Sequence, residues 1–132
     1  NKKQIVGFTA GNFDLIHPGY VKMFKEAKNH CTHLTVALHE DPSVENNKPK
    51  PVHSVEEREE ILMAMKDVDD VRVYWNEYGL DQYLKVGKFD VRFLGDDYKG
   101  KDYTGKELDL KIVWVDRSHS YSTTELKNKI KK

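Results

Sequence analysis

The chain has 132 residues, enough for one domain with a single sizeable core, and we expect residues 1–132 to form that one domain. Basic and acidic residues number 22 each, so the formal net charge is zero, which argues against a protein that coats nucleic acid. No apolar run approaches the roughly 18 residues of a membrane span. We therefore predict neither a nucleic-acid partner nor a transmembrane segment.

The first strand signal is an apolar run at residues 5–9, and similar runs recur along the chain. They predict five strands, at residues 5–9, 34–38, 71–75, 91–94 and 112–115. Helical spacing of apolar residues separates these runs. It predicts helices that begin at Pro18 and after Ser54, a short helix around residues 80–84 and a last helix after Ser122. Ser54 with Glu57, and Ser122 with Glu125, have the spacing of a capping box.

Strands that alternate with helices pair in parallel through right-handed crossovers. The predicted fold class is therefore α/β, a Rossmann-like open sheet of five parallel strands flanked by helices. Ligands of such sheets bind beyond the carboxyl ends of the strands. We therefore examined the turns that follow the strands, and three of them carry polar clusters.

The first cluster is the turn from Gly11 to Tyr20. Free N–H groups and a partial positive charge at the start of the following helix suit a phosphate group. His17 adds a donor that can be neutral or cationic near pH 7, and Gly19 would let the backbone approach a ligand closely. Taken alone, His17 is more often an ordinary N-terminal or packing histidine.

The second cluster is the stiff basic loop Lys48–Ser54, with Arg58 one turn into the next helix. Its two lysines can reach over a phosphate, although a solvated basic loop would look the same. The third cluster is the segment 117–124, whose hydroxyls and N–H groups at a helix start form another anion site, or simply cap that helix through Ser122.

Three anion-suited turns at one edge of a sheet indicate a nucleoside triphosphate held from several sides. The P-loop pattern G-x-x-x-x-G-K-[ST] does not occur in the chain, and neither does the dinucleotide pattern G-x-G-x-x-G. A P-loop enzyme is therefore excluded, and a dinucleotide site is not expected.

Several motifs in this order resemble the nucleotidylyltransferase superfamily with the H-x-G-H signature. Within it, the chain is most similar to the small cytidylyltransferases, above all the glycerol-3-phosphate cytidylyltransferases. The matching segments are Gly11–Asp14, His53–Arg58, Gly95–Tyr98, Arg117 and Ser122–Thr124.

The resemblance implies a reaction and an assembly. A small alcohol phosphate, with glycerol 3-phosphate favoured, attacks the α-phosphorus of CTP, pyrophosphate leaves, and a CDP-alcohol such as CDP-glycerol forms. Mg²⁺ accompanies the triphosphate, and the protein is a cytoplasmic homodimer. The single cysteine, Cys31, and the absence of a signal-peptide core after residues 1–4 also favour a reducing, cytoplasmic location.

The resemblance also implies site residues, carried over by position. The implied catalytic residues are His17, Lys50, Arg117 and Tyr20. The implied nucleotide-binding residues are Ala10, Gly11, Asn12, Phe13, Gly19, Asp96, Ser122 and Thr123. The implied acceptor-binding residues are Lys50, Arg58 and Asp97. No residue of the chain is implied as a metal ligand.

The chain departs from the signature at Tyr20, where the family has its second histidine. A phenol offers a neutral hydrogen bond and no positive charge at pH 7. Loss of one stabilising donor typically costs about 2.7–4 kcal/mol of transition-state stabilisation, or about 10²–10³ in rate. Tyr20 could act as a weaker donor, His119 or Lys48 could compensate, or the protein could bind nucleotide with little turnover.

Two further alternatives stay open. The segment 117–124 has Ser118, Ser120 and Tyr121 where the family has threonine, glycine and isoleucine, so its contacts to base and acceptor are undecided. Relatives that use ATP with a sugar phosphate or a cofactor precursor carry the same turn-and-helix motif. The chain could therefore be an adenylyltransferase instead.

Overall fold

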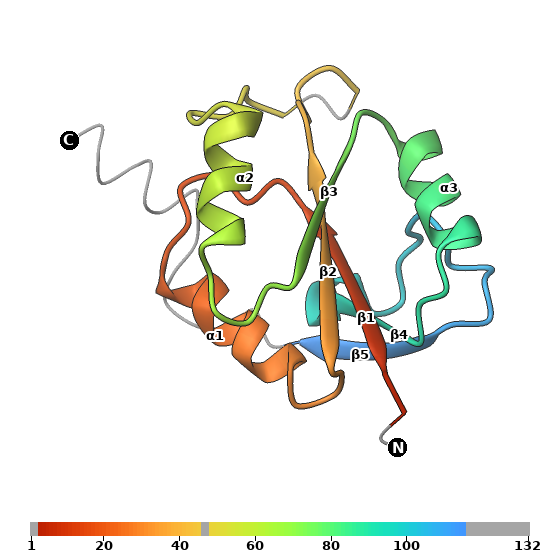
Figure 1. Ribbon diagram of the computed structural model, residues 1–132. Helices are drawn as coiled ribbons and strands as arrows, with labels where there is room; N and C mark the ends of the chain where they lie inside the picture. Colours follow the sequence, from red (N-terminus) through yellow and green to blue (C-terminus); the bar gives the residue numbers. More distant parts are fainter. Residues whose placement is uncertain (1–2, 46–47, 116–132) are drawn as a thin grey trace.

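Five parallel strands form one sheet in the order β3-β2-β1-β4-β5, as seen in a computed structural model that describes residues 3–45 and 48–115 (Figure 1). The strands are β1 (Val6–Gly11), β2 (His33–His39), β3 (Asp70–Tyr74), β4 (Val91–Gly95) and β5 (Lys111–Val115). Each predicted strand is confirmed, with its ends shifted by at most two residues.

Three α-helices connect or flank the strands in the described part of the chain. They are α1 (Pro18–Ala27), α2 (Val55–Met63) and α3 (Glu77–Val86). The predicted capping box of α2 is confirmed, because the Ser54 side chain accepts the N–H of Glu57 while the Glu57 side chain accepts the N–H of Ser54. A short 3-10 helix, η1 (Asp96–Tyr98), follows β4. The helix predicted after Ser122 lies outside the described residues.

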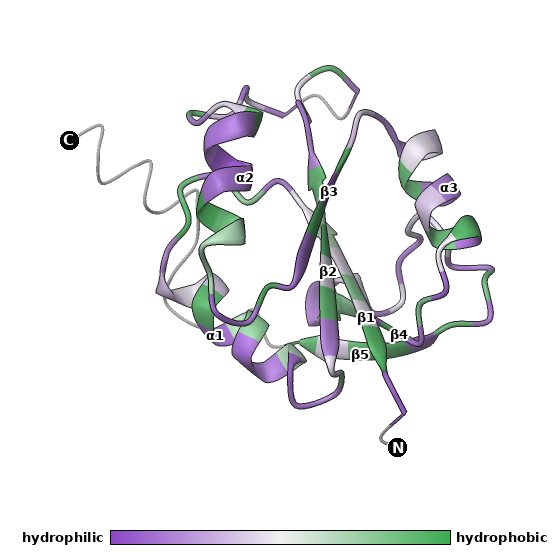
Figure 2. Cartoon of the chain, in the orientation of Figure 1, coloured by the Kyte–Doolittle hydropathy of each residue, from purple (hydrophilic) through white to green (hydrophobic). Residues whose placement is uncertain are grey.

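The helices cover both faces of the sheet, with α1 and α2 on one face and α3 on the other (Figure 1). Strand β2 shows why: its alternate residues Leu34, Val36 and Leu38 belong to the apolar cluster with α1, whereas Ala37 belongs to the cluster with α3. Apolar residues occur along the strands, and polar residues dominate much of α2 (Figure 2). The predicted α/β fold with a five-stranded parallel sheet is therefore correct.

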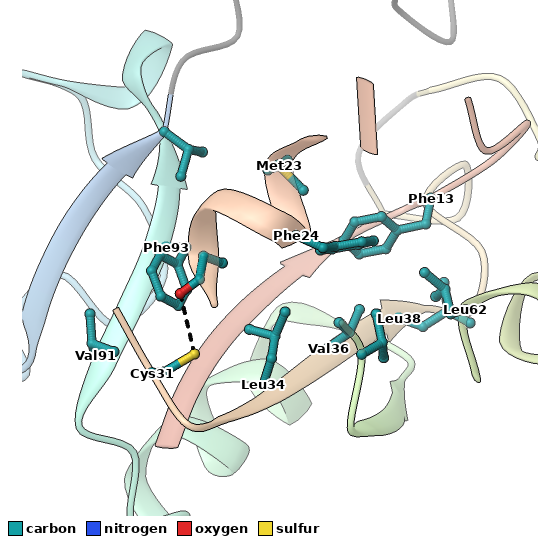
Figure 3. Packing of buried hydrophobic residues seen from close by; sticks show 13 residues of the cluster. Phe13, Met23, Phe24, Cys31, Leu34, Val36, Leu38, Leu62, Val91 and Phe93 are labelled. Carbon is teal, nitrogen blue, oxygen red and sulfur yellow. Dashed lines mark hydrogen bonds between the residues drawn. The ribbon is translucent and has the colours of Figure 1, made fainter. Parts of the chain in front are cut away.

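The larger apolar cluster fixes the turn after β1 to the core. Phe13, two residues beyond the end of β1, packs with Phe24 of α1 at a ring-centroid distance of 5.6 Å (Figure 3). Cys31 is buried between α1 and β2, and its thiol donates to the carbonyl of Ala27 at 3.4 Å. Across residues 3–45 and 48–115, no helix is both long and apolar enough to cross a membrane.

Candidate active site

The sheet changes its direction of winding between β1 and β4, which are neighbours although β2 and β3 separate them in sequence. Connections leave the carboxyl ends of these two strands toward opposite sides, and ligands of open parallel sheets bind at that point. Residues 12–17 follow β1, and the exposed Asp96 and Asp97 of η1 follow β4. The first predicted cluster and the acidic turn after β4 thus lie at one edge of the sheet.

The turn after β1 has an unusual backbone. Phe13 and Leu15 have φ values of 48° and 50°, in the left-handed region that costs a residue with a side chain free energy. Burial of Phe13 in the core and the hydrogen bonds of Asp14 hold the turn in this conformation. Strain of this kind is concentrated at functional sites, so the turn is a candidate site on structural grounds as well.

His17 is the N-cap of α1 and is only 7% exposed. Its Nδ1 accepts the backbone N–H of Gly19 at 3.1 Å. An accepting Nδ1 carries no proton, so the neutral ring has its proton on Nε2. The turn therefore fixes both the tautomer and the orientation of the imidazole, and makes Nε2–H a donor.

The start of α1 uses its own N–H groups. Pro18 has none, Gly19 donates to His17 Nδ1, and Tyr20 donates to the carbonyl of His17 at 2.9 Å. The expectation that these groups meet a phosphate stays a prediction. The geometry instead presents His17 Nε2–H as the donor of this turn.

Tyr20, in place of the second signature histidine, stacks on the His17 ring with a centroid distance of 4.4 Å and an interplanar angle of 27°. Its ring also meets Phe13 edge-on at 5.4 Å. Tyr20 therefore lies directly beside the imidazole. A catalytic role for Tyr20 stays a prediction.

Asp14 connects the turn to the basic loop. Its carboxylate is buried and accepts the backbone N–H groups of Val52 at 2.8 Å and His53 at 3.0 Å. Lys50 lies two residues before Val52 and is exposed. The loop that carries Lys50 is thereby attached to the turn that carries His17, which brings the second predicted cluster to the first.

Arg58 also joins the turn after β1 to the basic loop. It is 1% exposed, and its Nη1 donates to the carbonyls of Asn12 at 2.9 Å and His39 at 2.7 Å. Its Nη2 donates to Glu40 at 2.6 Å, and its Nε donates to the carbonyls of His53 and Ser54. Burial lowers the pKa of Arg58, while the nearby Asp14 carboxylate acts in the opposite direction. The structure gives this guanidinium backbone partners in three segments, and its contact with an acceptor stays a prediction.

The other predicted residues divide into two groups. Ala10 and Gly11 end β1 at the same edge, and a Cβ on Gly11 would lie 3.2 Å from the Phe13 ring, so a larger residue there would crowd that ring. Arg117, Ser122 and Thr123 lie outside the described residues, so the third cluster is not placed. Among residues 3–45 and 48–115, no group of three histidine, cysteine or acidic residues could hold a metal ion.

Residues 8–130 match the family described as cytidylyltransferase-like. The chain belongs to the cytidylyltransferase-like family. Membership makes it a nucleotidyltransferase-type domain, as the H-x-G-H resemblance implied.

Curated relatives of this family member include the bifunctional protein HldE of Campylobacter concisus, 34% identical over 98% of this chain, and that of Rhodopseudomonas palustris, 36% identical over 94%. The chain spans only 28% and 26% of those proteins.

Two solved structures share the fold. One is a lipopolysaccharide core biosynthesis protein of Thermoplasma volcanium, with a TM-score of 0.63 and 22% identity over 98% of this chain and 88% of that one. The other is the pantoate-beta-alanine ligase of Francisella tularensis, with a TM-score of 0.62 and 17% identity over 97% of this chain and 66% of that one.

Proposed function

We propose that this domain transfers a nucleotidyl group from a nucleoside triphosphate to the phosphate of a small phosphorylated substrate, with release of pyrophosphate. The observation that carries the proposal is the attachment of the Lys50 loop to the His17 turn through Asp14. This attachment joins a fixed imidazole donor and a lysine at the carboxyl edge of β1, within a chain that belongs to the cytidylyltransferase-like family.

The reaction needs positioning and charge neutralisation more than proton transfer. A phosphate oxygen of the acceptor forms a bond to the α-phosphorus, the bond from the α-phosphorus to the bridging oxygen breaks, and pyrophosphate carries that electron pair away. The attacking phosphate is already deprotonated at pH 7, so no general base is required. Mg²⁺ bound to the triphosphate would neutralise part of its charge.

Each residue then has a defined task. His17 donates from Nε2 to a triphosphate oxygen, and its Nδ1 keeps that proton in place by accepting from Gly19. Lys50 screens the two phosphate groups from each other. Tyr20 supports the imidazole by stacking and supplies a neutral hydroxyl where the family has a charged donor. Asp14 and Arg58 hold the segments that carry these groups.

Two donor and acceptor pairs follow from the family and its relatives. CTP with glycerol 3-phosphate is the first, because of the family description and the motif resemblance. ATP with a sugar phosphate is the second. It is favoured by the Francisella tularensis ligase, whose structure was solved with an ATP analogue, and by relatives named for HldE and lipopolysaccharide core biosynthesis rather than for CDP-glycerol. In both cases we expect a cytoplasmic homodimer.

A pyrophosphate-release assay tests the proposal, with CTP, ATP, UTP and GTP each paired with glycerol 3-phosphate and with hexose 1-phosphates. The decisive variant is His17→Asn. Asparagine is a good N-cap and can still accept from Gly19, but it has no group at the place of Nε2–H. We expect a loss of about 10²–10³ in turnover at unchanged stability. His33→Gln, at the first residue of β2 and so away from the carboxyl edge of the sheet, is the matched control. Absence of pyrophosphate with every pair would exclude the proposal.

A further inference from the structure

The segment that follows β2 is attached to the start of α3. Glu45 ends this segment, residues 41–45, and its Oε1 accepts the backbone N–H of Glu77 at 2.9 Å, across 32 positions of sequence. The chain then continues into the basic loop, where Lys50 lies five residues beyond Glu45. The Asp14 carboxylate fixes that loop at its other end. Lys50 therefore lies between two carboxylate contacts, each of which attaches the chain to another element.

The Glu45 contact fits the chemistry of a helix start. Glu77 is the first residue of α3, so its N–H has no partner within the helix. Asn76 caps the helix by accepting the N–H of Gly79 at 2.8 Å, and the Glu45 carboxylate is favoured by the positive end of the helix dipole. The Glu77 side chain in turn accepts the Thr104 hydroxyl at 3.2 Å. Glu45 is thus bound to a helix start that is itself held by the β4–β5 connection.

Residues 41–45 form a turn with hydrogen bonds of its own. Asp41 Oδ1 accepts both the N–H of Ser43 at 3.0 Å and the Ser43 hydroxyl at 2.6 Å. The carbonyl of Asp41 accepts the N–H of Val44 at 3.4 Å. Because these bonds join the two ends of the turn, loss of the Glu45 contact would release the turn that carries the Asp41 carboxylate.

The charge of Asp41 links this turn to Lys50. Hydrogen bonding from the Ser43 hydroxyl is the main cause that lowers the pKa of Asp41. The positive charges of Lys50 and Arg58 lower that pKa further, so Lys50 lies close enough to the carboxylate to interact with it. An exposed ion pair is weak and the lysine stem is flexible. The carboxylate can therefore orient the ammonium only if the turn that carries it is fixed.

We propose that Glu45 is a positioning residue of the active site, which fixes the 41–45 turn on α3 and thereby orients the Lys50 ammonium through Asp41. The inference rests on the proposed function, in which Lys50 screens the two phosphate groups from each other. Glu45 has no chemical step of its own. It acts at one end of the basic loop as Asp14 acts at the other, and small displacements of a charged group in an active site reduce the rate strongly.

Hydrogen exchange tests the contact itself. A first-turn N–H is ordinarily open to solvent, so protection of the Glu77 amide reports its bond to Glu45. We expect this amide to exchange at least about tenfold faster in Glu45→Ala, whereas Glu45→Gln, whose side-chain oxygen can still accept, should keep most of the protection. Glu60→Ala, at an exposed glutamate of α2, is the matched control and should leave the amide unchanged. Unaltered exchange in Glu45→Ala would overturn the inference.

A double-mutant cycle tests whether Glu45 acts through Lys50. We measure kcat/KM by pyrophosphate release from a γ-labelled nucleotide with the protein in excess, so that the slow Lys50→Ala variant stays measurable. We expect Glu45→Ala to lower kcat/KM about tenfold in the wild-type chain but less than about twofold in the Lys50→Ala chain. Glu45→Gln should keep most of the activity, and Glu60→Ala should keep all of it.

The cycle also separates failure of this inference from failure of the proposed function. An equal loss in both chains, or no loss in either, would overturn the positioning role while the wild-type protein still released pyrophosphate. No pyrophosphate from the wild-type protein with any pair of substrates would instead remove the proposed function, and this inference with it.

Discussion

The Oδ1 atom of Asp14 accepts the backbone N–H of His53 at 3.0 Å, which joins two residues 39 positions apart in the sequence. The second carboxylate oxygen accepts the N–H of Val52 at 2.8 Å. One buried side chain thus fixes the loop of Lys50 to the strained turn that precedes His17. The relative position of the two proposed catalytic residues depends on a carboxylate that has no proposed chemical role of its own.

Asp14→Asn should therefore reduce both stability and activity. An amide has one accepting oxygen, and its NH₂ group would face a backbone N–H that also donates. We expect the free energy of unfolding to fall by about 1–3 kcal/mol, and kcat/KM to fall because the Lys50 loop is no longer fixed. Urea denaturation and the pyrophosphate assay measure the two effects. Asp102→Asn, at an exposed residue that pairs with Lys106, is the control, and equal behaviour of the two variants would contradict the prediction.

Arg58→Lys separates a positioning role from direct acceptor binding. A lysine ammonium cannot reproduce the planar set of donors that reaches the carbonyls of Asn12, His39 and Glu40. We expect a loss of about 3 kcal/mol or more in the free energy of unfolding, since buried carbonyls would lose charge-assisted hydrogen bonds. Arg72→Lys should cost much less, because the Arg72 side chain is exposed.

The kinetic result for Arg58→Lys decides between the two roles. If Arg58 acts through position, kcat falls at protein concentrations corrected for the folded fraction, and the KM values of nucleotide and acceptor change together. A variant that stays as stable as the wild type, but raises only the KM of the acceptor, would support the acceptor contact that the family resemblance implies.

Local signals in the sequence were sufficient for the elements of the fold. Ser54 and Glu57 predict the start of α2 because the capping box needs only residues three positions apart. The strands follow from short apolar runs, and the sheet edge follows from their alternation with helices. The partners of Asp14 and Arg58 could not be predicted in the same way, since they are backbone groups contributed by distant segments and carry no side-chain signal.

Strand-end aromatics show the same limit. Tyr74 and Trp75 are adjacent in sequence and equally aromatic, yet Tyr74 is buried against His39 while Trp75 is exposed. Which of them turns inward depends on the register of β3 with β2, which pairs Tyr74 with His39. Similarly, the sequence shows Arg92 only as a polar residue within an apolar strand. The packing of the segment around Thr104 shows that Arg92 is buried.

Tyr20→His should increase turnover. The variant restores the second histidine of the signature at a ring that already stacks on His17, and an imidazolium adds positive charge where the triphosphate develops negative charge. We expect kcat to rise by up to about 10²-fold, with little change in stability because the partly buried site accommodates the smaller ring. Tyr20→Phe removes only the hydroxyl, and should lower kcat if that hydroxyl donates. If the wild-type protein already turns over well and Tyr20→His does not raise kcat, the tyrosine hydroxyl is sufficient for catalysis.

His39 should make stability depend on pH near neutrality. Burial lowers its folded-state pKa below the ordinary value of 6.5, while the charges of Glu77 and Glu45 oppose this effect and that of Arg58 reinforces it. Between the folded-state pKa and 6.5, the unfolded chain therefore binds more protons than the folded chain, so the free energy of unfolding falls as the pH decreases through that window and is level above it. Urea midpoints from about pH 7.5 to about pH 5 measure the slope, and His39→Gln should flatten it. An unaltered slope in His39→Gln would mean that the buried imidazole accepts a proton in the folded state as readily as in water.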